Sequence, residues 1–221
     1  MEDEIAIHVG PLVIGLSLLT TWGIMLVISL VAWLTTRHLE LLPDSIQTLV
    51  EGIMLSIDEA ILAIVPEHGR QILPFIATLW LFLIVANLVS LIPGLHSPTR
   101  DLSVTSALAV LVFFSVHWFG IKTQGLKNYL RHYLAPSPIL LPFHIISEFT
   151  RTLALAIRLF GNIMSLEMTA MLVLLVAGFL APIPILMLHI IEALVQAYIF
   201  GMLALIYLAS AMQSQSPNSQ E

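Results

Sequence analysis

Long apolar stretches dominate this chain, and most of its polar residues lie between them. A membrane-spanning helix needs about 20 predominantly apolar residues, and five stretches reach that length. They are Val9–Leu34, Ile72–Ile92, Leu102–Ile121, Leu141–Leu180 and Ile183–Met212. The pattern predicts an all-α, polytopic membrane protein with about five spans. No internal repeat divides the sequence, so we expect residues 1–221 to form a single membrane domain.

A further stretch, Asp44–Val65, has a helical period instead of being apolar throughout. Its apolar residues recur three or four positions apart, and the opposite face carries Gln47, Glu51, Asp58 and Glu59. Such an amphipathic helix is expected to lie at the membrane interface rather than to cross it. Because its polar face is acidic, the sequence does not decide whether this helix lies against a lipid surface or against a protein partner.

The fourth apolar stretch is longer than one crossing requires. Leu141–Leu180 would run about 60 Å as a helix, roughly twice the ~30 Å thickness of the hydrocarbon layer. Such a helix either breaks or crosses at a steep tilt. No proline interrupts its interior, so we favour a long tilted hairpin formed by the last two helices.

The composition supports the membrane assignment and excludes several other classes. Apolar residues make up 58% of the chain and charged residues 10%, against roughly 25% charged in ordinary globular proteins. This excludes a soluble enzyme, a nucleic-acid binder and a disordered protein. The chain has no cysteine, which excludes disulfides and thiolate metal sites. The acidic segment Met1–Glu4 lacks the basic start of a signal peptide, so we expect the first apolar stretch to be retained.

The charges in the loops predict an orientation. If the spans alternate, five cations lie on one side of the membrane, namely Arg37, Arg70, Lys122, Lys127 and Arg131. Arg100, beside Asp101, lies on the other side together with the acidic N-terminus. Because cytoplasmic loops are enriched in Lys and Arg, we expect the N-terminus outside and the C-terminus in the cytoplasm.

Ionisable and polar residues inside the last two apolar stretches are the candidates for chemistry, because such groups are costly in a membrane and usually functional. Six of them recur three, four or seven positions apart, which keeps them on one helix face. They are His144, Glu148, Arg151, Arg158, Asn162 and Ser165. Glu167 lies nine residues after Arg158 and points to the opposite side. The last helix carries His189, Glu192 and Gln196, again three and four positions apart.

Folding the last two helices into an antiparallel hairpin places Arg158 near the depth of Gln196 and Glu167 near the depth of His189. Two opposed polar faces indicate water-accessible paths rather than one buried cluster. Three simpler interpretations stay open. Arg151 could snorkel to the interface or pair with Glu148, and Glu167 with His189 could be a static pair. Asn87, inside the second span, is expected to form a helix–helix hydrogen bond.

Motifs for other chemistry are missing from the sequence. His189 and Glu192 lack a second ligand pair at metal-binding spacing, so we expect no metal site. There is no phosphate-binding loop and no dinucleotide motif. We therefore expect no cofactor, no directly bound nucleotide and no catalytic chemistry in this chain itself.

Four stretches of the sequence resemble subunit a of F-type ATP synthases, the stator ion channel of the membrane sector. The most specific is Ser147–Asn162, which ends in Arg-Leu-Phe-Gly-Asn. The others are Asn87–Gly94, Pro98–Thr105 and Gln196–Phe200. The resemblance covers the chain from about residue 72 onward. Thr152 departs from it, since relatives commonly carry proline there.

The resemblance implies a role for each candidate residue. Arg158 matches the essential arginine that faces the ion-binding carboxylates of the rotating c-ring, and Asn162 and Gln196 match polar residues beside it. Groups in the half-channel open to the outer side are matched by Glu167, His189 and Asp101. The residues near the inner half-channel are His144, Ser147 and Glu148, and Glu192 is a further channel candidate.

The sequence hypothesis is thus a stator subunit with two offset half-channels and an arginine that couples H⁺ or Na⁺ passage to ring rotation and ATP synthesis. The implied partners are the c-ring, subunit b of the peripheral stalk and membrane lipid, with no nucleic acid. The implied location is the bacterial inner membrane. The alternatives are a secondary transporter with an intramembrane arginine site, which the missing repeat symmetry disfavours, and a structural membrane scaffold, which the aligned polar faces disfavour.

Overall fold

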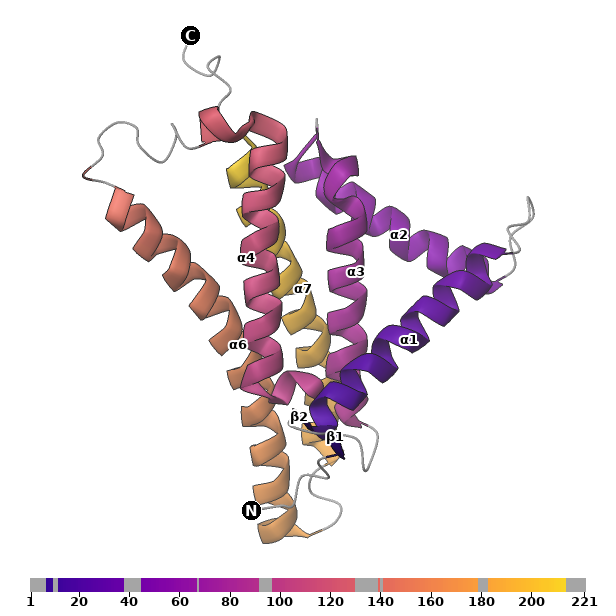
Figure 1. The fold of residues 1–221 in the computed structure, drawn as a ribbon. Coiled ribbons are helices and arrows are strands. Elements are labelled where there is room, and N and C mark those ends of the chain that lie inside the picture. Colours follow the sequence, from indigo (N-terminus) through magenta and orange to yellow (C-terminus); the bar gives the residue numbers. More distant parts are fainter. Residues whose placement is uncertain are drawn as a thin grey trace.

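The computed structural model describes residues 7–9, 12–37, 45–66, 68–91, 97–129, 139, 141–178 and 183–213, and they form a bundle of long helices (Figure 1). The helices are α1 (Leu16–Arg37), α2 (Ser45–Ile64), α3 (Gly69–Leu88), α4 (Leu102–Gln124), α6 (Leu141–Ala177) and α7 (Ile183–Gln213). Two short 3-10 turns, η1 (Val89–Leu91) and η2 (Pro98–Arg100), lie between α3 and α4. A two-stranded hairpin, β1 (Ile7–Val9) and β2 (Leu12–Ile14), precedes α1.

Five of these helices are long and apolar enough to cross a membrane, namely α1, α3, α4, α6 and α7. The expected fold class, a helical polytopic protein with five spans, is thereby confirmed. The amphipathic α2 is not among the five. Its Ile57 and Ile61 are buried, whereas Glu51 and Glu59 on its other face are exposed.

The first span begins later than the sequence pattern predicted. Val9–Leu34 was expected to be helical, but α1 begins at Leu16, and the residues before it pair as antiparallel strands with His8 opposite Val13. This segment is rich in β-branched residues, whose stiff side chains favour an extended backbone. The length of an apolar stretch does not reveal this preference for an extended backbone.

Three other helix ends agree with local sequence signals. Asp101 caps α4, because its Oδ1 accepts hydrogen bonds from the backbone N–H and the hydroxyl of Ser103 at 2.9 and 2.8 Å. Gly125 and Gly178 end α4 and α6 at φ of 78° and 84°, a left-handed conformation that suits glycine. Asp44, Ile92, Phe179, Leu180 and Arg131, which belong to the expected segments and loops, lie outside the described residues.

The arrangement in space places α3, α4 and α7 side by side (Figure 1), with α3 antiparallel to the other two. At the upper end of the view, Gln124 of α4 donates from Nε2 to the carbonyl of Ala211 in α7 at 2.7 Å. Helix α6 is continuous over 37 residues, and its upper half leans away from α4 (Figure 1). One long oblique helix therefore accommodates the apolar stretch that was too long for a direct crossing.

The contact between α3 and α7 depends on a glycine. A Cβ atom at Gly201 would lie 1.7 Å from Nε1 of Trp80, so only glycine fits beneath this indole. The ring of Trp80 also stacks on Tyr198, with centroids 6.0 Å apart, and its Nε1 donates to the Tyr198 carbonyl at 3.4 Å. These contacts hold the two helices that supply several of the candidate residues at a fixed relative height.

Candidate functional site

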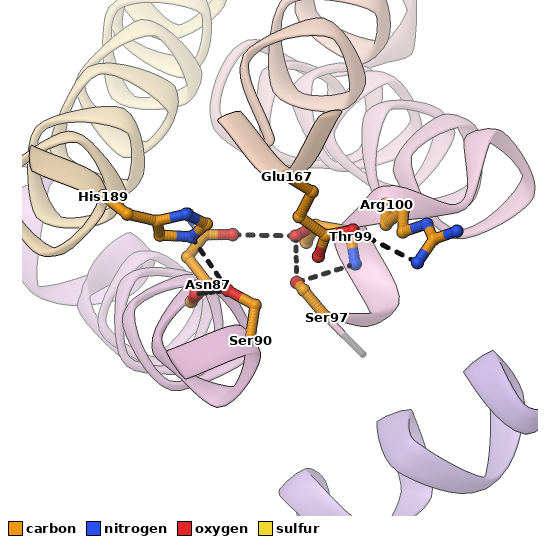
Figure 2. Close-up of polar contacts among 7 residues, drawn as sticks. All are labelled: Asn87, Ser90, Ser97, Thr99, Arg100, Glu167 and His189. Atoms are coloured by element: carbon orange, nitrogen blue, oxygen red, sulfur yellow. Dashed lines mark hydrogen bonds and ion pairs between the residues drawn. The ribbon is translucent and has the colours of Figure 1, made fainter. Parts of the chain in front are cut away.

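A network of polar side chains lies near the lower end of the bundle in Figure 1, where α3, η2, α6 and α7 meet (Figure 2). We call it the polar cluster, and it consists of Asn87, Ser90, Ser97, Thr99, Arg100, Glu167 and His189. Four of its members, Asn87, Ser97, Thr99 and His189, are buried. Buried polar groups must find hydrogen-bond partners within the protein, and the contacts of the cluster meet that requirement.

Asn87 is the centre of the polar cluster. Its Nδ2 donates to the carbonyl of Ala193 in α7 at 3.3 Å, and its Oδ1 accepts from the Thr99 hydroxyl at 2.9 Å. The hydroxyl of Ser97 contacts that of Thr99 and donates to the carbonyl of Ala86 at 2.8 Å. Asn87 thus connects α3 to α7 and to the segment around η2, which confirms its expected helix–helix hydrogen bond.

His189 is held by Ser90. Its Nε2 lies 2.8 Å from Oγ of Ser90, and the Ser90 hydroxyl donates to the Asn87 carbonyl at 2.9 Å. Which of the two atoms donates in their contact depends on the tautomer of the imidazole. The hydrogen bond therefore fixes the orientation of the imidazole.

Glu167 forms an ion pair with a residue that the sequence interpretation treated only as a loop cation. Its Oε2 lies 3.2 Å from Nη1 of Arg100, and this is the one ion pair between residues that the structure describes. Glu167 and His189 both belong to the polar cluster. Their polar atoms contact different partners, however, and Figure 2 shows them on opposite sides of the Asn87–Thr99 contact.

A second group of candidates lies near the middle of α6. Asn162 donates from Nδ2 to Oε1 of Gln196 at 2.6 Å. Gln196 is 1% exposed, and its Nε2 has no hydrogen-bond partner among the described residues. Arg158 is exposed and has no ion pair or hydrogen bond within the described part of the chain. Gln196 thus pairs with the residue one turn after Arg158.

The third group lies toward the start of α6. The guanidinium of Arg151 lies over the ring of Tyr207 in α7, 4.8 Å from its centroid, so the ring is its contact rather than the Glu148 carboxylate. Cation–π contacts of this kind are worth about 0.5–2 kcal/mol. Glu148 is half-buried, whereas His144 and Ser147 are exposed on the same helix.

Two further candidates have simpler surroundings. Asp101 caps α4 through its hydrogen bonds to Ser103, which is a structural role. Glu192 is half-buried in α7, one turn before Gln196. Sequence reasoning did not single out Ser90, Ser97, Thr99, Arg100 or Tyr207 as site residues. For three of them, Ser90, Thr99 and Arg100, the only signal was their place within the stretches that carry the resemblance.

The candidates therefore form three levels along α6. Glu148 lies ten residues before Arg158, and Glu167 lies nine residues after it, which corresponds to about 15 and 13 Å along a helix. The first level contains Arg151 and Tyr207, the middle level Asn162 and Gln196, and the last level is the polar cluster. An exposed arginine thus lies between two groups of polar side chains in a membrane-length helix.

This fold and these polar levels define an integral membrane protein with polar and ionisable groups inside apolar helices, as in ion-translocating proteins. The family model described as ATP synthase A chain matches residues 18–209. The chain belongs to this family.

Several bacterial proteins of the family are similar over nearly the full chain. ATP synthase subunit a 2 of Pelobacter propionicus is 63% identical, over 97% of this chain and 96% of its own length. ATP synthase subunit a 1 of Hahella chejuensis is 64% identical, over 98% of this chain and 93% of its own. ATP synthase subunit a of Legionella pneumophila is 57% identical, over 97% and 94%.

Proposed function

We propose that this chain is the stator ion-channel subunit of an F-type ATP synthase and that Arg158 couples ion passage to rotation of a c-ring. The observation that carries the proposal is the position of Arg158. It lies near the middle of α6, exposed and without an ion pair or hydrogen bond in the described part of the chain. A charged side chain at this depth is costly in lipid, so a partner surface must cover it.

A ring of carboxylates has the chemistry required of that partner. Guanidinium stays protonated in proteins and presents several donors in a planar fork. Its charge favours the ionised form of a carboxylate that passes close to it. A rotor carboxylate can therefore reach Arg158 only after it has released its ion, and the arginine repels any cation that would cross directly.

The two outer levels of polar side chains supply the two half-channels of the proposal. Glu167, His189 and Asp101 are assigned to the outer half-channel. The inner half-channel is assigned to Glu148, His144 and Ser147. Asn162 and Gln196 lie between them, and Glu192 is a further channel candidate. The proposal is supported by the separation of these levels along α6, because about 13 Å of helix lies between Arg158 and Glu167.

The proposed cycle needs no catalytic group in this chain. Each c-ring carboxylate takes up H⁺ or Na⁺ from one half-channel, is carried around with the ring and releases the ion into the other. A membrane potential contributes about 2.3 kcal/mol per charge per 100 mV to this movement. ATP synthesis itself belongs to other subunits of the complex, to which this chain is linked through the c-ring and subunit b.

The proposed location is the bacterial inner membrane, with the N-terminus outside and the C-terminus in the cytoplasm. The bacterial relatives and the distribution of cations support this orientation. Arg70 lies in the first turn of α3 and Lys122 near the end of α4, at the end of the bundle opposite Arg100. Because cytoplasmic loops are enriched in Lys and Arg, the polar cluster then faces the outer side.

Two variants of Arg158 test the proposal in membrane vesicles that contain the whole complex. Arg158→Lys should abolish ATP-driven ion pumping, since a compact ammonium lacks the permanent charge and planar fork of guanidinium. Arg158→Ala should in addition allow passive ion leakage between the half-channels. The matched control is Arg70→Lys, which alters an exposed arginine at the start of α3. A c-ring should copurify with every variant, and wild-type pumping by Arg158→Lys would refute the coupling role.

A further inference from the structure

The ion pair between Arg100 and Glu167 connects two distant parts of the chain. Arg100 ends η2, just before α4, and Glu167 lies in the last third of α6. Their side chains are 32% and 16% exposed, with Nη1 and Oε2 3.2 Å apart. Figure 2 shows the Glu167 side chain extending toward η2, while His189 lies on the other side of the Asn87–Thr99 contact.

The other titratable groups near this end of α6 have different contacts. Asp101, beside Arg100, bonds to Ser103, and His189 in α7 bonds to Ser90. Glu192 lies one turn further along α7 and is half-buried. Among the described residues, Arg100 is therefore the cationic side chain in contact with the Glu167 carboxylate.

We infer that Arg100 is a positioning residue for ion transport, which acts by holding the Glu167 carboxylate against η2 and away from His189. The inference rests on the proposed function, which assigns Glu167 to the outer half-channel. With Arg100 in place, the acid and the imidazole serve as two separate groups along the path rather than as one bonded pair. Without Arg100, the Glu167 carboxylate is free to leave η2 and to bond to His189, so the path no longer contains two separate groups.

A positioning role for Arg100 and a structural role lead to different expectations. Both side chains are half-buried, so the amount of assembled complex in the membrane is measured beside transport. A structural role predicts less complex, whereas a positioning role predicts slower transport per complex. The fork of guanidinium fixes the direction of a carboxylate better than an ammonium does. Replacement of Arg100 should therefore change the rate of transport and the chemical reactivity of the Glu167 carboxylate.

A double-mutant cycle on the whole complex in membrane vesicles tests the dependence on Glu167. Arg100→Gln should slow ATP-driven pumping about three- to tenfold, within the range that couplings between contacting residues produce. In a Glu167→Gln background the same change should cause no further loss, because the group that Arg100 positions is already gone. An equal loss in both backgrounds, or no loss in either, would overturn the inference.

Chemical labelling tests the contact itself. A water-soluble carbodiimide with glycine ethyl ester modifies carboxyl groups, and mass spectrometry measures the label on Glu167. Arg100→Gln should raise that label several-fold, while the control Arg70→Gln at the other end of the bundle should not change it. If Arg100→Gln does not accumulate in the membrane, Arg100→Lys replaces it and should raise the label to a smaller extent. An unchanged label on Glu167 in the variant examined would overturn the contact.

Failure of this inference is distinguishable from failure of the proposed function. Pumping by Arg158→Lys at the wild-type rate removes the proposed function, whatever the Arg100 variants do. An inactive Arg158→Lys together with an Arg100 effect independent of Glu167 removes the positioning role alone.

Discussion

The close approach of α3 and α7 can be tested by adding one methyl group at Gly201. The Cβ of alanine would lie 1.7 Å from Nε1 and 2.0 Å from Cδ1 of Trp80, far inside the distance at which carbon and nitrogen atoms can pack. Trp80 is 5% exposed and stacks on Tyr198, so its rigid ring has no free space to enter. Gly201→Ala must therefore separate the helices or displace the indole.

The expected cost follows from this geometry. Overpacking a filled interior typically costs about 1–3 kcal/mol and sometimes more, and the clash at Gly201 belongs at the upper end. Alanine regains up to about 1 kcal/mol from its better helix propensity, so the net destabilisation should be about 2 kcal/mol. The separation would also disturb the hydrogen bonds that Asn87 of α3 and Ser90 of η1 form with Ala193 and His189 of α7.

Heat inactivation of ATP-driven pumping in membrane vesicles measures this effect. Gly201→Ala should lose activity at a clearly lower temperature than the wild-type complex. Gly23→Ala is the matched control, because its Cβ would meet nothing within 4 Å. The combination Gly201→Ala with Trp80→Leu should recover part of the loss, since a smaller side chain makes room for the methyl group. A Gly201→Ala complex as heat-resistant as the control would refute the packing argument.

Two further predictions concern the orientation of α2 and the polar cluster. Single cysteines at Gln47, Glu51 and Asp58 should all react with a membrane-impermeant thiol reagent from the same side as a cysteine at Lys127, because an interfacial helix does not cross the membrane; labelling from both sides would mean a sixth span. Glu167→His or His189→Glu alone should slow pumping, since each leaves like groups at one depth. The double exchange should recover only part of the pumping rate, because it also removes the carboxylate that contacts Arg100. A double variant that pumps no faster than the slower single variant would show that the two residues do not share a path.

The features of this fold that could be predicted from the sequence are those that depend on a single stretch of residues. The length of an apolar stretch is a local property, so the stretches that became α3, α4, α6 and α7 could be recognised directly. The hairpin formed by β1 and β2 was not predicted, because the apolar stretch continues through it. The α-helical face that carries Arg158 and Asn162 could also be read from spacing alone.

Contacts between distant elements could not be read in this way. The predicted register placed Gln196 near the depth of Arg158, but Gln196 bonds to Asn162 one turn later. The depth at which two helices of a hairpin face each other depends on how the chain turns between them, which the sequence does not fix. Arg100 and Ser90 likewise became site residues only through the fold, because η2 brings Arg100 beside α6 and η1 brings Ser90 beside α7.

The arginines of this chain differ in how their charge is accommodated. Arg37 lies over the ring of Trp33, Arg100 pairs with Glu167, and Arg151 lies over Tyr207. Each of them finds an electron-rich or anionic group within the same chain. Arg70 and Arg158 have no such partner among the described residues, but Arg70 lies in the first turn of α3, whereas Arg158 lies near the middle of α6. Because burial of Arg158 against lipid would be costly, the reasoning that explains the three accommodated arginines supports the proposed c-ring carboxylate as its partner.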